Sequence, residues 1–142
     1  MAVKQISVFV QNEKGALAEV LKEIAAGGIE LRALSIADTN DFGILRIITN
    51  DEAKTEELLK TSGYICNVTD VVAACVDDKP GALAKEIAVL TEAGVEVEYL
   101  YAFVTTGKQA CVVLRVNDTA LAEATLTKAG VKLLQEADMK NM

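Results

Sequence analysis

The chain contains one pattern twice, and this internal duplication constrains the fold more than any local motif. The stretch "EKGALAEVL" at Glu13 to Leu21 returns as "KPGALAKEI" at Lys79 to Ile87. The glycines of the two stretches, Gly15 and Gly81, lie 66 positions apart. Repeats of this kind indicate duplicated structural units, and they take precedence over local signals when a fold is predicted.

The match continues beyond the glycine stretches. At the same offset, "GGIELRAL" at Gly27 to Leu34 falls on "AGVEVEYL" at Ala93 to Leu100. After one inserted residue, "TND" at Thr49 to Asp51 falls on "VND" at Val116 to Asp118. The sequence therefore predicts two copies of a unit of about 70 residues, a first domain over residues 1–69 and a second over residues 70–142.

Within each copy the hydrophobic periodicity changes in a fixed order. Apolar, β-branched Ile6–Val10 is typical of a strand, and Leu17, Val20, Leu21, Ile24 and Ala25 then recur at helical spacing. Gly28 is placed to end that helix in a left-handed C-cap. The further elements expected in the first copy are strands near 29–37, 44–49 and from 64, a turn over 38–43, and a helix over 52–62 capped by Asn50 or Asp51.

The second copy repeats this order. We expect its strands near 71–76, 95–105, 109–116 and 131–135, and its helices near 82–92 and 119–129. The order strand, helix, strand, strand, helix, strand is typical of an α+β fold. The predicted architecture is two ferredoxin-like βαββαβ units, each a four-stranded antiparallel sheet with two helices on one face. Because no linker rich in glycine or proline separates the copies, we expect the units to pack against each other.

Composition narrows the classes of function. Apolar residues make up 51% of the 142-residue chain, which is enough for a buried core. A net charge of -7 argues against nucleic acid as a partner, because non-specific binding depends on Lys and Arg. No apolar run reaches the roughly 20 residues of a membrane span, so we expect a soluble, cytoplasmic protein without a membrane partner.

The chemistry-bearing residues indicate neither catalysis nor a metal site. The chain has no histidine, the commonest general base and metal ligand. Cys66, Cys75 and Cys111 lack paired metal spacing and lie in apolar runs, so buried reduced thiols are the simplest interpretation. The sequence also lacks dinucleotide and phosphate-loop motifs. We therefore predict no catalytic residues, no metal and no cofactor.

The duplicated motifs resemble those of the ACT domain, a small amino-acid-binding regulatory module. The resemblance rests on an apolar strand, "PGALA" opening a helix, and "GIEL" or "GVEV" opening the second strand. The first copy has Lys14 where the family usually has proline, and Glu30 and Glu96 stand where family members often have asparagine. The resemblance covers nearly the whole chain and implies two ACT domains in tandem.

The two loops have a physical rationale for binding a small zwitterion. A helix start presents unpaired amides and the positive end of the helix dipole, and glycine lets a ligand approach the backbone. An amino-acid carboxylate suits such a place. The candidate ligand-binding residues are Asn12, Glu13, Lys14, Gly15, Ala16, Leu17 and Glu30 in the first copy, and Asp78, Lys79, Pro80, Gly81, Ala82, Leu83 and Glu96 in the second.

Several of these residues have a second interpretation. Asn12, and Asp77 or Asp78, can orient the ligand or accept a hydrogen bond from its ammonium group, but Asn12 and Asp78 can equally just cap the helix. Glu30 and Glu96 follow the first helix of each copy, where a strand start beside the loop would bring a carboxylate to the ligand ammonium. Alternatively, each is a solvated strand residue.

Aromatic residues distinguish the two copies. Tyr99, Tyr101 and Phe103 occupy alternate positions of one predicted strand, where the first copy has Ala33, Ser35 and Ala37. The contrast suggests two unequal ligand sites, one filled by its own rings and one open. The alternative is that the rings cover a sheet face at a domain or subunit interface.

Two functional hypotheses remain. In the first, the protein is a sensor in amino-acid metabolism that binds a free amino acid and regulates a partner enzyme. In the second, it is a ligand-free protein-interaction or oligomerisation module, since edge strands and a bare sheet face favour association. A homodimer is expected under either hypothesis.

Overall fold

The computed structural model describes residues 2–39 and 41–142. The chain forms two compact units, which span Lys4–Thr69 and Asp70–Lys140. In the predicted turn over 38–43, Asn40 lies outside the described residues. No helix in the described part of the chain is long and apolar enough to cross a membrane.

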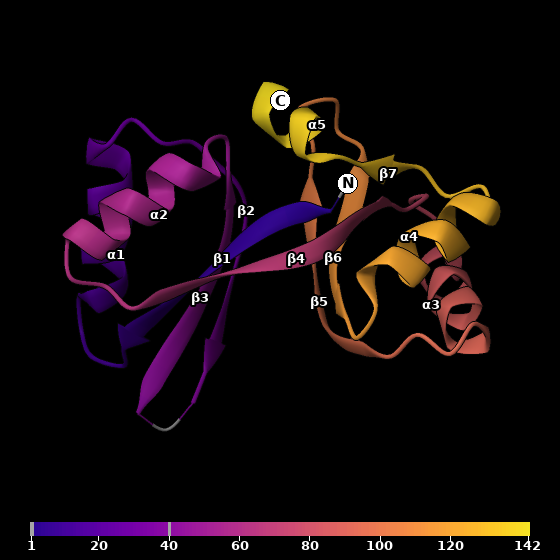
Figure 1. Cartoon of the computed structure of the whole chain (residues 1–142), viewed down its shortest axis with the longest axis horizontal. Helices are drawn as coiled ribbons and strands as arrows, with labels where there is room; N and C mark the ends of the chain where they lie inside the picture. Colours follow the sequence, from indigo (N-terminus) through magenta and orange to yellow (C-terminus); the bar gives the residue numbers. More distant parts are fainter. Residues whose placement is uncertain (1, 40) are drawn as a thin grey trace. The chain divides into compact units, whose positions relative to one another are not determined.

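The first unit has the predicted βαββαβ order. Its elements are β1 (Val3–Gln11), α1 (Ala16–Ala26), β2 (Leu31–Asp38), β3 (Phe42–Thr49), α2 (Glu52–Thr61) and the first part of β4 (Cys66–Cys75). The strands lie in the order β2-β3-β1-β4, and β3 is antiparallel to both β1 and β2. Both helices lie on one face of this sheet (Figure 1).

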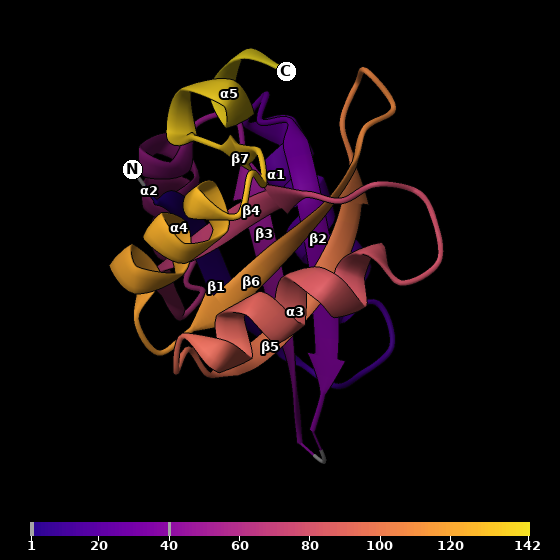
Figure 2. The ribbon, with the colours of Figure 1, turned by 90° about the vertical axis from the view of Figure 1, so that its right-hand side faces the viewer.

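The second unit repeats the arrangement. It comprises the second part of β4, α3 (Ala82–Glu92), β5 (Val97–Val104), β6 (Ala110–Val116), α4 (Thr119–Lys128) and β7 (Leu133–Leu134). Its strands follow the order β7-β4-β6-β5, and each of the three pairings is antiparallel. Figure 2 shows α3 and α4 on the same face of the strands. The prediction of two ferredoxin-like units is therefore confirmed.

Three elements differ from the expectation. The last strand of the first copy and the first strand of the second are one continuous strand, β4, because its sequence "CNVTDVVAAC" is rich in β-branched residues and lacks glycine and proline. The strand expected near 131–135 is reduced to the two residues of β7. A short helix that was not predicted, α5 (Glu136–Asn141), begins at a capping box formed by Gln135 and Asp138.

Each unit packs its helices against its own apolar core. In the first unit α1 places Val20 and Ile24 against Val8, Leu45 and Ile47. In the second, Leu90 of α3 and Leu126 of α4 pack with β-strand residues such as Leu114. The i, i+4 spacing within α1 puts its two side chains on the face toward the sheet.

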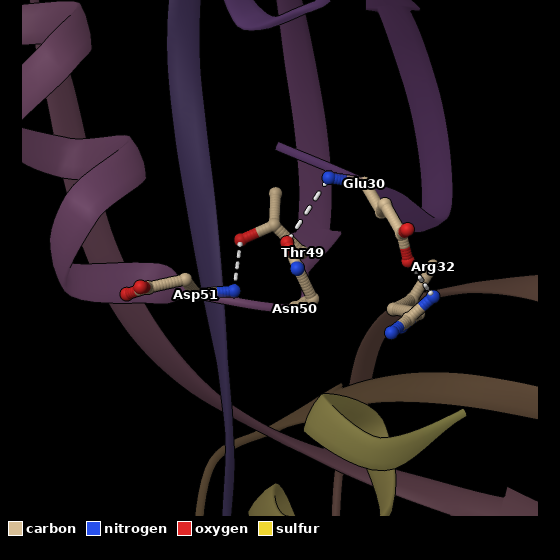
Figure 3. Close-up of polar contacts among 5 residues, drawn as sticks. All are labelled: Glu30, Arg32, Thr49, Asn50 and Asp51. Carbon is tan, nitrogen blue, oxygen red and sulfur yellow. Dashed lines mark hydrogen bonds and ion pairs between the residues drawn. The ribbon is translucent and has the colours of Figure 1, made fainter. Parts of the chain in front are cut away.

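The duplicated Asn-Asp pair fixes the second strand and second helix of each unit. The Asn50 side-chain oxygen accepts a hydrogen bond from the Glu30 N–H at 3.0 Å, and the Asn50 N–H donates to the Glu30 carbonyl at 3.1 Å (Figure 3). Asn117 and Glu96 make the same pair of bonds at 2.9 and 3.2 Å. Each asparagine therefore holds the backbone where the second strand begins.

The following aspartate caps the helix. Asp51 accepts a hydrogen bond from the Lys54 N–H at 3.1 Å at the start of α2, and Asp118 accepts from the Leu121 N–H at 3.0 Å at the start of α4. Of the two residues predicted as possible caps of α2, Asp51 is the one that caps it. The same two-residue motif thus performs the same two tasks in both units.

We predict that Asn50→Ala and Asn117→Ala each lower the free energy of unfolding by about 1 kcal/mol, because each removes a side-chain bond to the Glu30 or Glu96 N–H. Denaturant unfolding followed by circular dichroism measures the change. Asn12→Ala is the control, since the Asn12 side chain donates to the exposed Asp38 carboxylate and not to a backbone group. Equal losses in all three variants would show that the asparagine bonds have no special role.

Candidate ligand-binding site

The loops after β1 and β4 have the same backbone geometry in both units. Gly15 and Gly81 occupy the N-cap positions of α1 and α3 with φ values of 87° and 83°, in the left-handed region that favours glycine. The Ala16 N–H donates to the Glu13 carbonyl at 3.2 Å, and the Ala82 N–H donates to the Lys79 carbonyl at 3.3 Å. The sequence match between the two loops therefore corresponds to a match in hydrogen bonding.

Neither helix start has a side-chain cap. Among the residues that the structure describes, no side chain accepts a hydrogen bond at the N-cap of α1 or α3. The first amides of a helix have no partner within the helix itself, so the N–H groups at the next two positions, 17–18 and 83–84, point out of the helix ends. Both loops consequently offer backbone donors and the positive end of the helix dipole to an anionic group.

The prediction that Asn12 and Asp78 cap the helices is wrong. Glycine takes the N-cap position, so both residues lie too early in the loop to reach the helix amides. The Asn12 amide instead donates to the Asp38 carboxylate at 3.1 Å, which connects the loop to the end of β2. Asp78 is exposed beside Gly81. Both residues therefore remain next to their loops.

Glu30 does not lie beside the loop of its own unit. Gln11, at the loop end of β1, is in register with Phe42, and the β2 residue at this end of the sheet is Asp38. Glu30 precedes the other end of β2, which is 8 residues long, so at about 3.3 Å per residue it lies about 25 Å away along the sheet. Its carboxylate pairs with Arg32 at 2.9 Å (Figure 3).

Glu96 is placed in the same way in the second unit. Val97 pairs with Val116, whereas Val104, at the far end of β5, pairs with Ala110. The Val76 N–H, just before the loop, donates to the Ala110 carbonyl at 2.9 Å. The expectation that Glu30 and Glu96 lie next to the loops of their own units is therefore wrong, because the second strand runs toward the loop instead of starting there.

The loop of the second unit opens onto a cavity of about 360 Å³. Asp78, Gly81 and Leu83 line it from the loop and α3, and Ala102, Phe103 and Val104 line it from β5. A Cβ atom added to Gly81 would meet no other atom within 4 Å. The cavity thus combines an apolar wall with backbone donors and nearby carboxylates. Lys79 and Asp77 form an ion pair of 3.9 Å, but both side chains are exposed.

The aromatic residues of β5 lie as the alternation predicted. Tyr101 and Phe103 are buried, at 9% and 8% exposure, whereas Ala102 and Val104 between and after them are exposed. Phe103 forms part of the wall of the cavity beside Gly81. The position equivalent to Phe103 in the first copy is Ala37, so the two units present walls of different size at this point.

The three cysteines are free thiols, as the sequence suggested. The Cys111 thiol lies 3.7 Å from the Cys75 sulfur on the neighbouring strand. Burial, together with the nearby Cys75, raises the pKa of Cys111 to about 12, so this thiol stays protonated at neutral pH. Among the described residues no group of three or more His, Cys, Asp or Glu side chains is arranged to hold a metal ion.

We predict that Gly81→Ala and Gly15→Ala each lower the free energy of unfolding by about 1 kcal/mol, because a Cβ disfavours left-handed backbone. The space around both glycines is open, so the loss reflects backbone strain and not a clash. Gly107→Ala is the matched control, since Gly107 does not have a positive φ. Thermal unfolding measures the effect, and a Gly81→Ala variant as stable as the control would contradict this account.

Similarity to known proteins agrees with this architecture. A family model described as an ACT domain pair matches residues 1–142. The crystal structure of protein BT0572 from Bacteroides thetaiotaomicron is 39% identical, with a TM-score of 0.92 over 100% of this chain and 98% of that one. None of the curated protein sequences matches the chain.

More distant structures share the fold. The ligand-free regulatory subunit of aspartate kinase from Thermus thermophilus is 17% identical, with a TM-score of 0.67 over 92% of each chain. A structure of the aspartokinase alpha and beta subunits is 20% identical, with a TM-score of 0.61 over 89% of this chain and 91% of that one. Because the family model covers every residue and the duplicated motifs fold into matching units, the chain belongs to the ACT domain family and is an ACT domain pair.

Proposed function

We propose that this ACT domain pair is a sensor that binds a free amino acid and regulates a partner enzyme of amino-acid metabolism. The observation that carries the proposal is the cavity beside Gly81, where uncapped helix amides, exposed carboxylates and an apolar wall meet. These groups match the three parts of an amino acid: its carboxylate, its ammonium group and its side chain.

The amino acid would bind by its two charged groups. Its carboxylate accepts hydrogen bonds from the N–H groups of Leu83 and Ala84 at the start of α3, where the helix dipole favours negative charge. Its ammonium group lies near Asp78, and its side chain contacts Ala102 and Val104, which share one face of β5. Lys79, Pro80 and Ala82 shape the loop that holds these groups in place.

The loop of the first unit offers the same backbone chemistry. Gly15 has the same left-handed conformation as Gly81, and Ala16 and Leu17 begin α1 as Ala82 and Leu83 begin α3. Asn12, Glu13 and Lys14 are the polar residues around this second candidate site. We leave Glu30 and Glu96 out of both sites, because each lies at the other end of its own sheet.

Regulation requires that the amino acid bind one arrangement of the protein better than another. The ligand can shift the equilibrium between the two arrangements by no more than this difference in binding free energy. One structure that shares the fold is the regulatory subunit of an enzyme, aspartate kinase. We therefore propose an enzyme as the regulated partner and place the sensing function in the two halves, residues 1–69 and 70–142.

Isothermal titration calorimetry of the whole chain with each of the twenty amino acids tests the proposal. We expect at least one amino acid to bind, and we expect Gly81→Ala to weaken it about tenfold by placing a methyl group where the ligand approaches the amides. Gly107→Ala controls for the added methyl group. If no amino acid binds or raises the melting temperature, the sensor proposal fails, because a ligand of the folded state must stabilise it.

Exposed apolar residues on the edge strands support a second candidate, an oligomerisation module without a ligand. Leu34 and Ile36 of β2 are 48% and 49% exposed, and Val104 of β5 is 65% exposed. Within the described part of the chain, β2 and β5 each pair with only one strand of their own unit. Such edges favour association, so we propose that the protein forms a homodimer.

Light scattering after size-exclusion chromatography tests this association. We expect a dimer for the natural chain and a shift toward monomer for Leu34→Glu with Ile36→Glu, since two charges oppose burial of the strand edge. Leu121→Glu, which changes an exposed leucine on α4, is the control. A natural chain that remains monomeric at high concentration would exclude the dimer.

A further inference from the structure

A second cavity occurs at equivalent places in both units. In the second unit it has a volume of about 340 Å³ and lies between α3, the end of β4 and the segment that follows α4. In the first unit a cavity of about 320 Å³ lies between α1, β1 and the segment that follows α2. Gly63 and Gly130, which are equivalent in the repeat, line the respective cavities. The cavity is therefore a feature of the duplicated fold.

The two cavities differ at equivalent positions of their linings. Phe9, Phe42, Tyr64 and Ile65 line the first, and the rings of Phe9 and Phe42 pack edge to face at 6.5 Å. At the equivalent positions the second has Cys75, Gln109, Val131 and Lys132. The first cavity therefore has aromatic rings and a single charged side chain, Glu19, whereas five charged side chains line the second.

Glu86 is a charged residue at a position where the first unit has an apolar one. It occupies the position of Val20, which is fully buried in the core of the first unit. Glu86 precedes Leu90 by one helical turn, so it projects from the same face of α3 as a core residue. One oxygen of its carboxylate is buried and has no hydrogen-bond partner among the described residues. Glu86 as a whole is half-buried, but a buried oxygen without a partner still destabilises the fold, so its presence calls for a functional reason.

The charges around Glu86 favour a ligand with both an ammonium group and carboxylates. Two carboxylates, Asp77 and Glu86, and three lysines, Lys79, Lys85 and Lys132, line the cavity. The lining therefore has one excess positive charge, although the whole chain has a net charge of -7. Burial and the neighbouring Asp77 both raise the pKa of Glu86, because both disfavour its charged form. An ammonium group between the two carboxylates would stabilise that charged form and so oppose the rise in pKa.

We propose that this cavity is an inner binding site of the second unit for an acidic α-amino acid, whose ammonium group binds Glu86 and Asp77 and whose carboxylates bind the lysines around Lys132. An acidic amino acid carries one net negative charge, which matches the lining. The inner site adjoins the proposed sensor site, and the two cavities share Asp77 and Lys79. Their other walls differ: Ala129 and Lys132 line only the inner cavity, whereas Gly81 and Phe103 line only the other. The proposal stands whether or not the Gly81 loop binds a ligand.

Calorimetry of the whole chain with aspartate and glutamate tests the inner site. We expect saturable binding, weakened at least about tenfold by Glu86→Val and Glu86→Gln, because each removes a charged hydrogen bond. Lys132→Met should weaken binding similarly, whereas Lys128→Met, which removes an exposed lysine of α4 outside the cavity, should have no effect. Val104→Ala, which changes a side chain that lines only the loop cavity and does not strain the loop, should also leave this binding unchanged, and this separates it from binding at the loop.

Glu86→Val is informative because it restores the residue that the first unit uses at this place. We expect this variant to melt at a higher temperature than the natural chain while losing the amino acid, a combination that a purely structural glutamate would not give. Succinate, which lacks the ammonium group, and lysine, which has a second positive charge, should bind more weakly than aspartate. Absence of binding by aspartate and glutamate, or equal binding by the Glu86 and Lys132 variants, would overturn the proposal.

The raised pKa of Glu86 also predicts a pH dependence. Since the folded chain holds this proton more tightly than the unfolded chain, stability falls as the pH rises from the ordinary glutamate pKa of about 4.3 through the raised value in the fold. The titratable groups around it are Asp77, Lys79, Lys85, Lys132 and Cys75, together with Cys111 of β6. We expect Glu86→Gln to remove part of this fall in melting curves recorded across that range, and saturating aspartate to reduce it in the natural chain. If the melting temperature of Glu86→Gln depended on pH as that of the natural chain does, this would contradict both the raised pKa of Glu86 and its role in the site.

Discussion

A left-handed glycine at the start of the first helix is the constraint on which both units depend. Gly15 and Gly81 are the last residues of the loops that lead from a strand into a helix, and among the described residues no side chain caps either helix. This arrangement leaves helix amides available and positions the apolar face of the helix over the sheet. A residue with a Cβ in either place would strain the turn that connects the two layers. The same feature therefore sets the fold and creates the candidate binding site.

Duplication has preserved the framework of the two units while their cavities have diverged. The Asn-Asp pair, the glycine turns and the strand order are the same in both. The residues around the cavities differ: an aromatic hollow in the first unit corresponds to a charged one in the second. Framework positions make backbone hydrogen bonds that any working copy requires, whereas cavity walls are free to change. Two copies in one chain can thus offer sites of different chemistry.

The sequence predicted those parts of the candidate site that lie close together along the chain. The glycine, the uncapped amides and the polar residues before them are all neighbours along the chain, so their proximity follows from local geometry. The wall formed by Phe103 and Val104 comes from another strand and depends on register. Glu30 and Glu96 show the limit of the sequence argument. Their motif predicted a strand start, and this was right, but strand direction places that start at the far end of the sheet.

The sequence by itself determined the duplication, the order of helices and strands, and the glycine turns. The turns and elements depend on residues close together in the chain, and the duplication is a direct repeat of the amino-acid sequence. Only the tertiary structure decided that the two copies share the continuous strand β4, that glycine and not Asn12 or Asp78 occupies the cap position, and that Glu86 takes the place of a core valine beside a charged cavity. These features depend on which elements meet across the sheet, and packing between distant segments settles them. The sequence alone does not distinguish a glutamate at this helical position from a surface residue, and the buried oxygen of half-buried Glu86 appears only when α3 is placed on its sheet.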